Sequence, residues 1–196
     1  MINALDVFKV FEKHRGEAIV MASGMSGQHW ADISTNSKRD VSIGGAMGCQ
    51  GPVALGLALS QPDTKVVLFD SEGSLLMNLG VLATIADQKP KNFYHILLDN
   101  ECYATTGGQP VPSSTEISYH GMAKDAGYPS VHSFEDLEDF AINIEGILNE
   151  PGPVFVAMKI LPEIENLPID LRPVVKRRSQ PQVIKEFRED LEIVVG

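Results

Sequence analysis

The sequence predicts an α/β fold, a doubly wound parallel sheet flanked by helices. Short apolar segments alternate along the chain with segments of helical period, as in proteins built from strand–helix–strand units. Residues 65–70 are apolar on both faces, as expected of a central strand in a parallel sheet. Small and polar residues follow several apolar segments, at the strand ends where such sheets bind ligands.

The first half of the chain begins with an amphipathic helix. Apolar side chains recur with helical period over residues 4–14, and Gly16 ends this helix. A short apolar strand is predicted at 18–22. The further elements predicted here are a small-residue loop at 23–27, a short helix at 28–35, a strand at 41–43 that runs into a glycine-rich stretch, and a closely packing helix at 52–59.

The second half continues the alternation. Ser133 is predicted to cap a helix over 134–148, because acidic residues follow in the first turn and suit the positive end of the helix dipole. The strands predicted in this half are 65–70, 93–98, 130–132 and 154–159, and the other helices are 75–86, 117–126 and 183–191.

Length and composition fit one domain with a short extension. The chain has 196 residues, of which 43% are hydrophobic and 21% charged, which is typical of a soluble globular domain with a sizeable core. We assign residues 1–161 to this domain. Residues 162–196 contain several prolines and a basic run at 176–178. We expect them to form a C-terminal extension that packs on a neighbouring subunit.

Charge and cysteine content narrow the function classes. The net charge of −10 argues against nucleic acid or an anionic membrane surface as the main partner. Cys49 and Cys102 are too few for a disulfide framework and fit a reducing compartment. No apolar run is long enough to cross a bilayer, and the N-terminus does not have the pattern of a signal peptide. The predicted location is therefore cytoplasmic.

Polar residues at two strand ends suggest a metal holding a diphosphate. Glu72 follows the strand at 65–70, and Asn100 follows the strand at 93–98. Such oxygen ligands suit a hard divalent cation. Gly73 and Ser74 open the next predicted helix, where a phosphate can rest on the helix N-terminus. The net negative charge makes a metal and local backbone N–H groups necessary for binding an anion.

These segments resemble the thiamine-diphosphate enzymes. That family carries Gly-Asp-Gly, a spacer and Asn-Asn. Here the triplet is Ser71-Glu72-Gly73 and the pair is Asp99-Asn100. The amino-acid sequence of residues 73–80 and 105–110 is similar to that of the sulfopyruvate decarboxylase beta subunit and of the C-terminal part of phosphonopyruvate decarboxylase. The resemblance covers roughly residues 1–160 and implies the diphosphate-binding domain of the thiamine-diphosphate fold.

The resemblance implies roles for the polar strand ends. Glu72, the side chain of Asn100 and the backbone carbonyl of Cys102 become the expected ligands of Mg²⁺, and Asp70 is a spare carboxylate beside them. Asp99, in place of the first Asn, is expected to support the loop. The alternatives are a solvated turn residue at position 72 and a plain turn residue at position 100.

Further residues are expected to hold the cofactor, thiamine diphosphate. The resemblance implies that Gly45 accepts a hydrogen bond from the aminopyrimidine and that Met47 bends the cofactor. A lone Met is otherwise usually a core residue. The loop 105–109 closes over the diphosphate, reaches substrate or is simply mobile, and His29 lies on the cofactor side. The cofactor-binding residues predicted in this way are Gly45, Ala46, Met47, Gly73, Ser74, Asn100 and Tyr103.

The resemblance also implies a missing half of the site. Thiamine chemistry needs a carboxylate on the pyrimidine ring, and the family takes that Glu from a separate pyrimidine-binding domain. No catalytic residue is therefore expected on this chain. We predict a hetero-oligomer in which this subunit serves a 2-oxo acid decarboxylase, with an alpha subunit supplying the Glu. The basic residue for an anionic substrate tail is expected on that partner, because nothing basic lies near the motifs in the sequence.

Two other interpretations remain open from the sequence. One is a thiamine-dependent carboligase subunit similar to acetolactate synthase, since the acceptor pocket lies largely on the partner. The other is a non-catalytic relative with a scaffold or regulatory role, which the departures at Ser71, Glu72 and Asp99 motivate.

Overall fold

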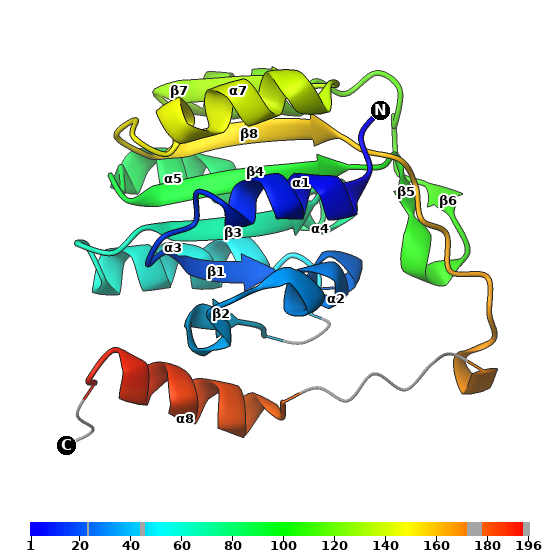
Figure 1. The fold of residues 1–196 in the computed structure, drawn as a ribbon. Coiled ribbons are helices and arrows are strands. Elements are labelled where there is room, and N and C mark those ends of the chain that lie inside the picture. The colour runs from blue at the N-terminus through cyan, green and yellow to red at the C-terminus, as the bar shows by residue number, and fades with distance from the viewer. Residues whose placement is uncertain (23, 44–45, 172–177, 194–196) are drawn as a thin grey trace.

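The chain folds around one parallel sheet with helices on both faces (Figure 1). The computed structural model describes residues 1–22, 24–43, 46–171 and 178–193, with no side chains described for 24–28 and 169. The strand order is β2-β1-β3-β4-β8-β7, and every pair in this sheet is parallel. The predicted α/β fold with a doubly wound parallel sheet is therefore confirmed.

The strands and helices have the following bounds. The sheet consists of β1 (Ile19–Ala22), β2 (Asp40–Val41), β3 (Val66–Ser71), β4 (Phe93–Asp99), β7 (Ser130–Phe134) and β8 (Val154–Lys159), and β5 (Cys102–Tyr103) pairs with β6 (Gln109–Pro110) in a separate hairpin. The helices are α1 (Ala4–Glu12), α2 (Gly24–Ile33), α3 (Gln50–Ser60), α4 (Glu72–Leu76), α5 (Val81–Gln88), α6 (Tyr119–Ala126), α7 (Leu137–Ile147) and α8 (Gln180–Asp190), with short 3-10 helices η1 (Ser37–Arg39), η2 (Ala104–Thr106) and η3 (Ile169–Leu171).

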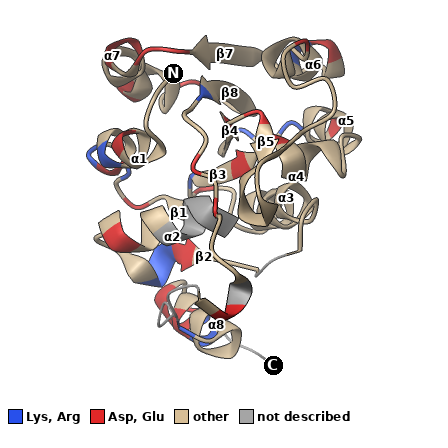
Figure 2. Ribbon diagram, turned by 90° about the vertical axis from the view of Figure 1, so that its right-hand side faces the viewer, with Lys and Arg blue, Asp and Glu red and all other residues tan. Residues whose placement is uncertain are grey.

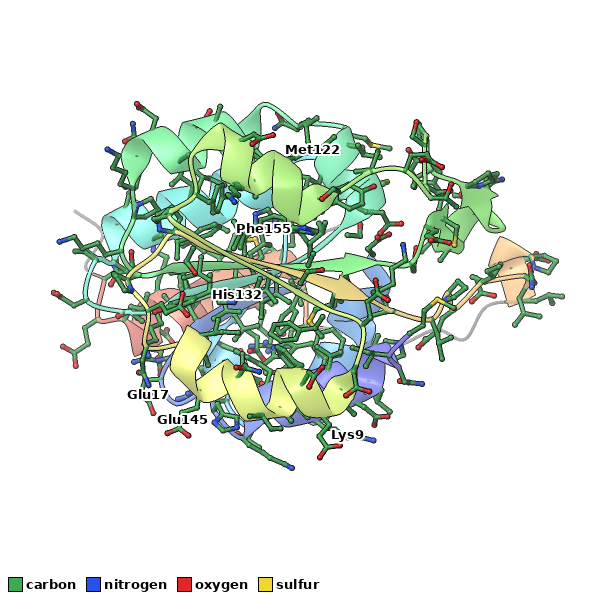
Figure 3. All side chains as sticks on the ribbon, turned by 90° about the horizontal axis from the view of Figure 1, so that it is seen from above. Lys9, Glu17, Met122, His132, Glu145 and Phe155 are labelled. Atoms are coloured by element: carbon green, nitrogen blue, oxygen red, sulfur yellow. The ribbon has the colours of Figure 1, made fainter. Side chains whose placement is uncertain are left out.

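Two apolar layers hold the helices against the sheet. On one face, α1, α2 and α7 pack on a cluster that contains Phe8, Phe11 and Phe69, all 0% exposed. On the other face, α3, α5 and α6 pack on a cluster that contains Phe93 and Phe155 (Figure 3). Burial of these apolar faces is the main stabilising term. It also fixes the central strands β3 and β4, which are buried almost throughout.

The strand order places a switch point beside β3. From β1 the chain first goes to β2 on one side and then returns to β3 on the other. Connections that leave in opposite directions open a crevice beyond the carboxyl ends of the strands, where doubly wound folds bind ligands. A ligand-binding site is therefore expected at the ends of β1 and β3 and the neighbouring end of β4.

The predicted helix over 75–86 is interrupted in the structure. It forms two helices, α4 and α5, separated by turns around Asn78. The side chain of Asn78 donates a hydrogen bond from Nδ2 to the carbonyl of Gly48, 2.9 Å away, which holds this break in place. The prediction of one helix was wrong because apolar residues continue with helical period across the break.

Two helix starts also differ from prediction. Helix α2 begins at Gly24, within the predicted loop at 23–27, because small residues do not prevent a helix. Ser133 is not the cap of α7, since β7 continues to Phe134 and pairs with β8. The cap is Asp136, whose side chain accepts hydrogen bonds from the backbone N–H groups of Glu138 and Asp139.

Replacing Asp136 by Ala is expected to lower the free energy of unfolding by about 1 kcal/mol, the usual effect of losing an N-cap. Ser133→Ala is the matched control, because Ser133 is exposed and its side chain is not the cap. It should change the stability by less than about 0.5 kcal/mol. Urea unfolding of both variants measures this. Equal losses would contradict the assignment of the cap.

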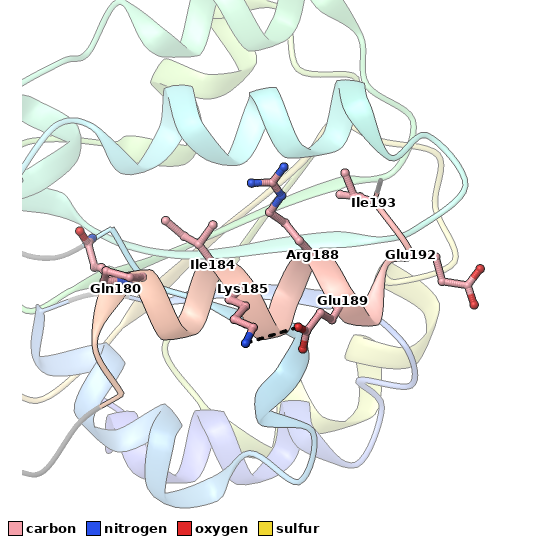
Figure 4. Close-up of a pocket in the computed structure, with 8 residues that line it drawn as sticks. Gln180, Ile184, Lys185, Arg188, Glu189, Glu192 and Ile193 are labelled. Carbon is pink, nitrogen blue, oxygen red and sulfur yellow. Dashed lines mark ion pairs between the residues drawn. The ribbon is translucent and has the colours of Figure 1, made fainter. Parts of the chain in front are cut away.

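The C-terminal extension ends in a helix that packs on the chain's own β2 edge (Figure 1). Phe187 of α8 is 7% exposed and belongs to the second apolar layer. Arg39 of η1 pairs with Asp190 at 2.8 Å. The outer face of α8 lines an open hollow (Figure 4). The division at residue 161 and the packing of the extension on a neighbouring subunit stay predictions.

Among the described residues, no helix is long and apolar enough to cross a membrane.

Candidate metal-binding site

The carboxyl end of β3 carries a fully buried carboxylate. β3 ends at Ser71, whose side chain caps α4 by accepting a hydrogen bond from the Ser74 N–H. Glu72 comes next and is 0% exposed. Within the described part of the chain, neither of its carboxylate oxygens has a hydrogen-bond partner. A buried carboxylate without a partner is strongly disfavoured unless it is protonated or holds a cation.

The pKa of Glu72 reflects this position. Burial, together with the smaller effect of the charge of Asp99, raises the pKa to about 7, although the backbone groups of Glu72 itself, Asn100 and Cys102 lower it in part. These influences show that Glu72 lies beside the turn that follows β4. The register explains the proximity, because Ser71 on β3 pairs with Leu98 on β4.

The turn after β4 presents the other predicted ligands. The side-chain oxygen of Asn100 accepts a hydrogen bond from the backbone N–H of Cys102 at 3.1 Å. The side-chain oxygen of Asp99 accepts one from the N–H of Glu101 at 3.2 Å. The structure therefore brings Glu72, Asn100 and Cys102 to one place, as the sequence predicted from two separate strand ends.

These residues fit a hard divalent cation. In the described residues no cluster of three or more His, Cys, Asp or Glu side chains could hold a metal, so the candidate is one carboxylate with amide and carbonyl oxygens. Mg²⁺ is bound in this way, by one or two carboxylates, with the remaining positions left to water and phosphate. The unpartnered carboxylate of Glu72 is the observation that calls for such an ion.

The predicted diphosphate cradle is closely packed. A Cβ atom on Gly73 would lie 2.7 Å from the ring of Tyr103, so that ring covers the glycine. The hydroxyl of Ser74 donates to the side chain of Gln50 at 2.8 Å and accepts from the N–H of Gly48 at 3.1 Å. Ser74 thus joins α4 to the start of α3. A diphosphate that contacts its hydroxyl must replace these hydrogen bonds.

The length of α4 also weakens one part of the prediction. The helix that was expected to bind the phosphate through its dipole has five residues rather than twelve. Partial charges at a helix end come from aligned peptide units, so a five-residue helix contributes less. A metal ion must therefore carry a larger share of the interaction with the diphosphate than the sequence suggested.

The predicted pyrimidine segment lies only partly within the described residues. Gly45 lies outside them. Ala46 and Met47 are exposed, with Met47 at 40%. Two contacts tie the following turn down: the N–H of Cys49 donates to the carbonyl of Ala46, and Asn78 binds Gly48. Met47 is thus not a core residue, so the alternative that it simply fills the core does not apply.

The loop at 105–109 and His29 both meet the segment that follows β8. A Cβ atom on Gly108 would lie 2.7 Å from Ile164, and the N–H of Glu165 donates to the carbonyl of Ala104 at 2.9 Å. His29 Nε2 lies 2.6 Å from a carboxylate oxygen of Glu163. This segment runs along the carboxyl ends of the strands (Figure 1), so it belongs to the surroundings of the site.

Asp70 is not a spare metal ligand. One of its oxygens lies 3.3 Å from His95 Nε2, and the other accepts the N–H of Ser71 at 2.9 Å. His95 is 0% exposed on the neighbouring strand β4. Asp70 therefore supports the turn before Glu72 from inside the sheet.

Sequence reasoning missed two residues at the site. Lys159 lies beside the motifs, with its Nζ 2.9 Å from Asp99, although no basic residue is near them in the sequence. It comes from β8, 60 residues away in the sequence. The other is Tyr119, which is 2% exposed and whose hydroxyl has no partner among the described residues. Burial raises its pKa, as do the charges of Asp99 and Glu72. No sequence signal identifies either residue.

The fold is a doubly wound α/β domain with a candidate metal-binding site at its switch point. Residues 22–158 match the family of the thiamine pyrophosphate enzymes, C-terminal TPP binding domain. The chain belongs to that family.

Individual relatives show which members of this family the chain resembles. The sulfopyruvate decarboxylase subunit beta of Methanothermobacter thermautotrophicus is 38% identical over 156 residues, which cover 78% of each chain. The subunit of that name from Methanocaldococcus jannaschii is 31% identical over 92% of this chain and 96% of its own. The phosphonopyruvate decarboxylase of Streptomyces hygroscopicus is 34% identical, and the match covers 88% of this chain but 41% of that enzyme.

A solved structure supports the fold. A thiamin diphosphate-dependent enzyme from Mycobacterium smegmatis superimposes with a TM-score of 0.71 at 20% identity, over 82% of this chain and 32% of the other.

Proposed function

We propose that this chain is the metal- and diphosphate-binding subunit of a thiamine-diphosphate-dependent 2-oxo acid decarboxylase. The substrate class is a short 2-oxo acid with an anionic tail, similar to sulfopyruvate or phosphonopyruvate. The observation that carries the proposal is the buried, unpartnered carboxylate of Glu72 beside the turn of Asn100 and Cys102. A scaffold protein has no use for such a costly group, so the geometry favours a binding role over the non-catalytic alternative.

The residues of this chain bind and orient the cofactor. Glu72, the side chain of Asn100 and the carbonyl of Cys102 would hold Mg²⁺, which would supply the positive charge that a bound diphosphate needs. Gly73 lets the ring of Tyr103 pack against the start of α4, and the exposed Met47 supports the bent cofactor. Thiamine diphosphate, when bound, supplies the electron sink for loss of carbon dioxide.

A partner subunit completes the site. The relatives named subunit beta match this chain over most of their length, whereas the phosphonopyruvate decarboxylase is more than twice as long as the matched part. This size relation supports a separate pyrimidine-binding alpha subunit that supplies the activating Glu. The carboligase alternative has weaker support, because the acetolactate synthase of Escherichia coli is 29% identical over 59% of this chain.

Calorimetric titration tests the proposal. Thiamine diphosphate is added to an equimolar mixture of this chain and its alpha subunit, with Mg²⁺ and with EDTA. Binding that requires Mg²⁺ is expected, followed by release of carbon dioxide from sulfopyruvate or phosphonopyruvate. Absence of binding in a mixture of two folded chains would contradict the proposal and favour the non-catalytic alternative. Binding with turnover only when a second 2-oxo acid is the acceptor would favour the carboligase.

The affinity for Mg²⁺ is expected to depend on pH through Glu72. Its pKa of about 7 in the metal-free chain means that Mg²⁺ competes with a proton below that pH. The apparent dissociation constant should rise about tenfold per pH unit below 7 and become constant above it. Titrations at pH 6, 7 and 8 measure this. Glu72→Gln, which cannot release the proton, controls for protonation of the diphosphate itself.

A further inference from the structure

The turn that carries Asn100 has an unfavourable backbone conformation. Glu101 has a φ of +65°, in the left-handed region that residues other than Gly, Asn and Asp rarely adopt. Among the described residues, two side-chain-to-backbone hydrogen bonds within the turn stabilise this conformation, those that Asp99 and Asn100 accept from residues two positions ahead. Asp99 and Glu101 also place two negative charges on either side of Asn100, and the charge of Asp99 acts on Glu72.

Lys159 connects both sides of this turn. Its Nζ lies 2.9 Å from a carboxylate oxygen of Asp99 and 2.6 Å from one of Glu101. The register holds the lysine in place, because Lys159 is the partner of Asp99 in the β4–β8 ladder. Viewed onto the carboxyl ends of the strands, basic and acidic segments lie close together at the ends of β8 and β4 (Figure 2). One cation at the end of a buried strand thus bridges the residues before and after Asn100.

We propose that Lys159 is a positioning residue that clamps the turn of residues 99–102, so that the side-chain oxygen of Asn100 and the carbonyl of Cys102 stay beside Glu72. The link to metal binding rests on the proposed function, whereas the clamp itself does not. Lys159 is already engaged by two carboxylates and partly buried. It is therefore not a free cation for the tail of a substrate.

The direction in which Mg²⁺ affinity changes when Lys159 is removed distinguishes a clamp from a purely electrostatic effect of the lysine. A lysine next to a metal site repels the metal ion, so its removal should tighten Mg²⁺ binding if charge alone matters. A clamp predicts the opposite, because a loosened turn no longer presents its two oxygens together. The variant Lys159→Met removes the charge, and Lys159→Arg keeps a cation that can bind both carboxylates.

Hydrogen exchange of the metal-free chain is the first experiment. In Lys159→Met, the amides of Glu101 and Cys102 are expected to exchange at least about tenfold faster than in the wild type, which corresponds to about 1.4 kcal/mol of lost protection. Lys159→Arg should stay near the wild type. Lys185→Met is the matched control, since it breaks an ion pair with Glu189 on α8, far from the turn. It should leave the exchange of residues 99–103 unchanged.

The second experiment is the titration of Mg²⁺ with thiamine diphosphate in the presence of the alpha subunit. Lys159→Met is expected to weaken binding about tenfold, and Lys159→Arg to restore it. Unchanged exchange in the turn, or tighter Mg²⁺ binding by Lys159→Met, would overturn the clamp. Faster exchange in a protein whose wild type binds no cofactor would refute the proposed function and leave the clamp standing.

A milder variant guards against a failure to fold. Glu101→Gln removes one of the two ion pairs and leaves Lys159 bound to Asp99. It should give an increase in exchange between those of the wild type and Lys159→Met. No increase would count against the clamp, because the lysine would then hold the turn no better with two partners than with one.

Discussion

Replacing Glu72 by Gln is expected to weaken Mg²⁺-dependent binding of thiamine diphosphate at least about 100-fold, and to stabilise the metal-free chain. Both effects come from the same buried charge. A neutral amide is a poor substitute for the anionic ligand that Mg²⁺ requires. Without the metal, however, the ionised carboxylate is buried and unpartnered. The amide avoids that cost, so function and stability should change in opposite directions.

The stabilisation has a defined pH dependence. The pKa of Glu72 is raised from 4.5 to about 7 in the folded chain. A raised pKa contributes stability that is fully present below 4.5 and is lost as the pH rises through 7. At pH 8 the wild type should therefore be about 3 kcal/mol less stable than Glu72→Gln, and near pH 4.5 the difference should vanish. Urea unfolding at pH 5, 6, 7 and 8 in EDTA measures this course.

A matched control uses a glutamate outside the site. Glu145→Gln on the exposed face of α7 (Figure 3) removes the same charge from the surface. It should change neither cofactor binding nor the pH course of stability by a measurable amount. If Glu72→Gln is no more stable than the wild type at pH 8 in EDTA, the Glu72 carboxylate is paired in solution. It is then not the unpaired metal ligand that we propose.

The sequence was informative where burial alone decides the structure. The strand β8 matches its prediction residue for residue, β4 extends one residue further at its end, and β3 is shifted by one residue at both ends. Such strands are apolar on both faces, so no other element can bury them. The break around Asn78 could not be predicted, because it depends on a hydrogen bond to Gly48 from a different loop.

The same limit applies to the candidate site. Glu72 and Asn100 could be found because parallel strands end at one edge, which links residues that are distant in the sequence. Lys159 could not, since its contact with Asp99 depends on the register of β4 against β8. The unpartnered hydroxyl of Tyr119 was equally hidden. In a site assembled from several strands, the motif residues can therefore be predicted from the sequence. The residues that hold the motif in place can be identified only from the structure.

Gly73→Ala is expected to lower the free energy of unfolding by about 2 kcal/mol, although Ala is the better helix former. The added Cβ would lie 2.7 Å from the ring of Tyr103 and 3.5 Å from Val111. A contact that short cannot persist, so the ring or the helix must move, and overpacking of this kind typically costs about 1–3 kcal/mol. Since Tyr103 belongs to the hairpin that follows the turn of Asn100, its displacement should also weaken Mg²⁺-dependent cofactor binding about tenfold, roughly 1.4 kcal/mol.

Gly56→Ala provides a control of opposite sign. Gly56 also lies in a helix, α3, but a Cβ there meets no atom within 4 Å. Ala should therefore stabilise the chain by up to about 1 kcal/mol through helix propensity alone. Thermal unfolding and calorimetric titration compare the two variants. If Gly73→Ala is as stable as Gly56→Ala and binds the cofactor normally, Tyr103 does not pack over the glycine, and the backbone of α4 is not held close to the site by that ring.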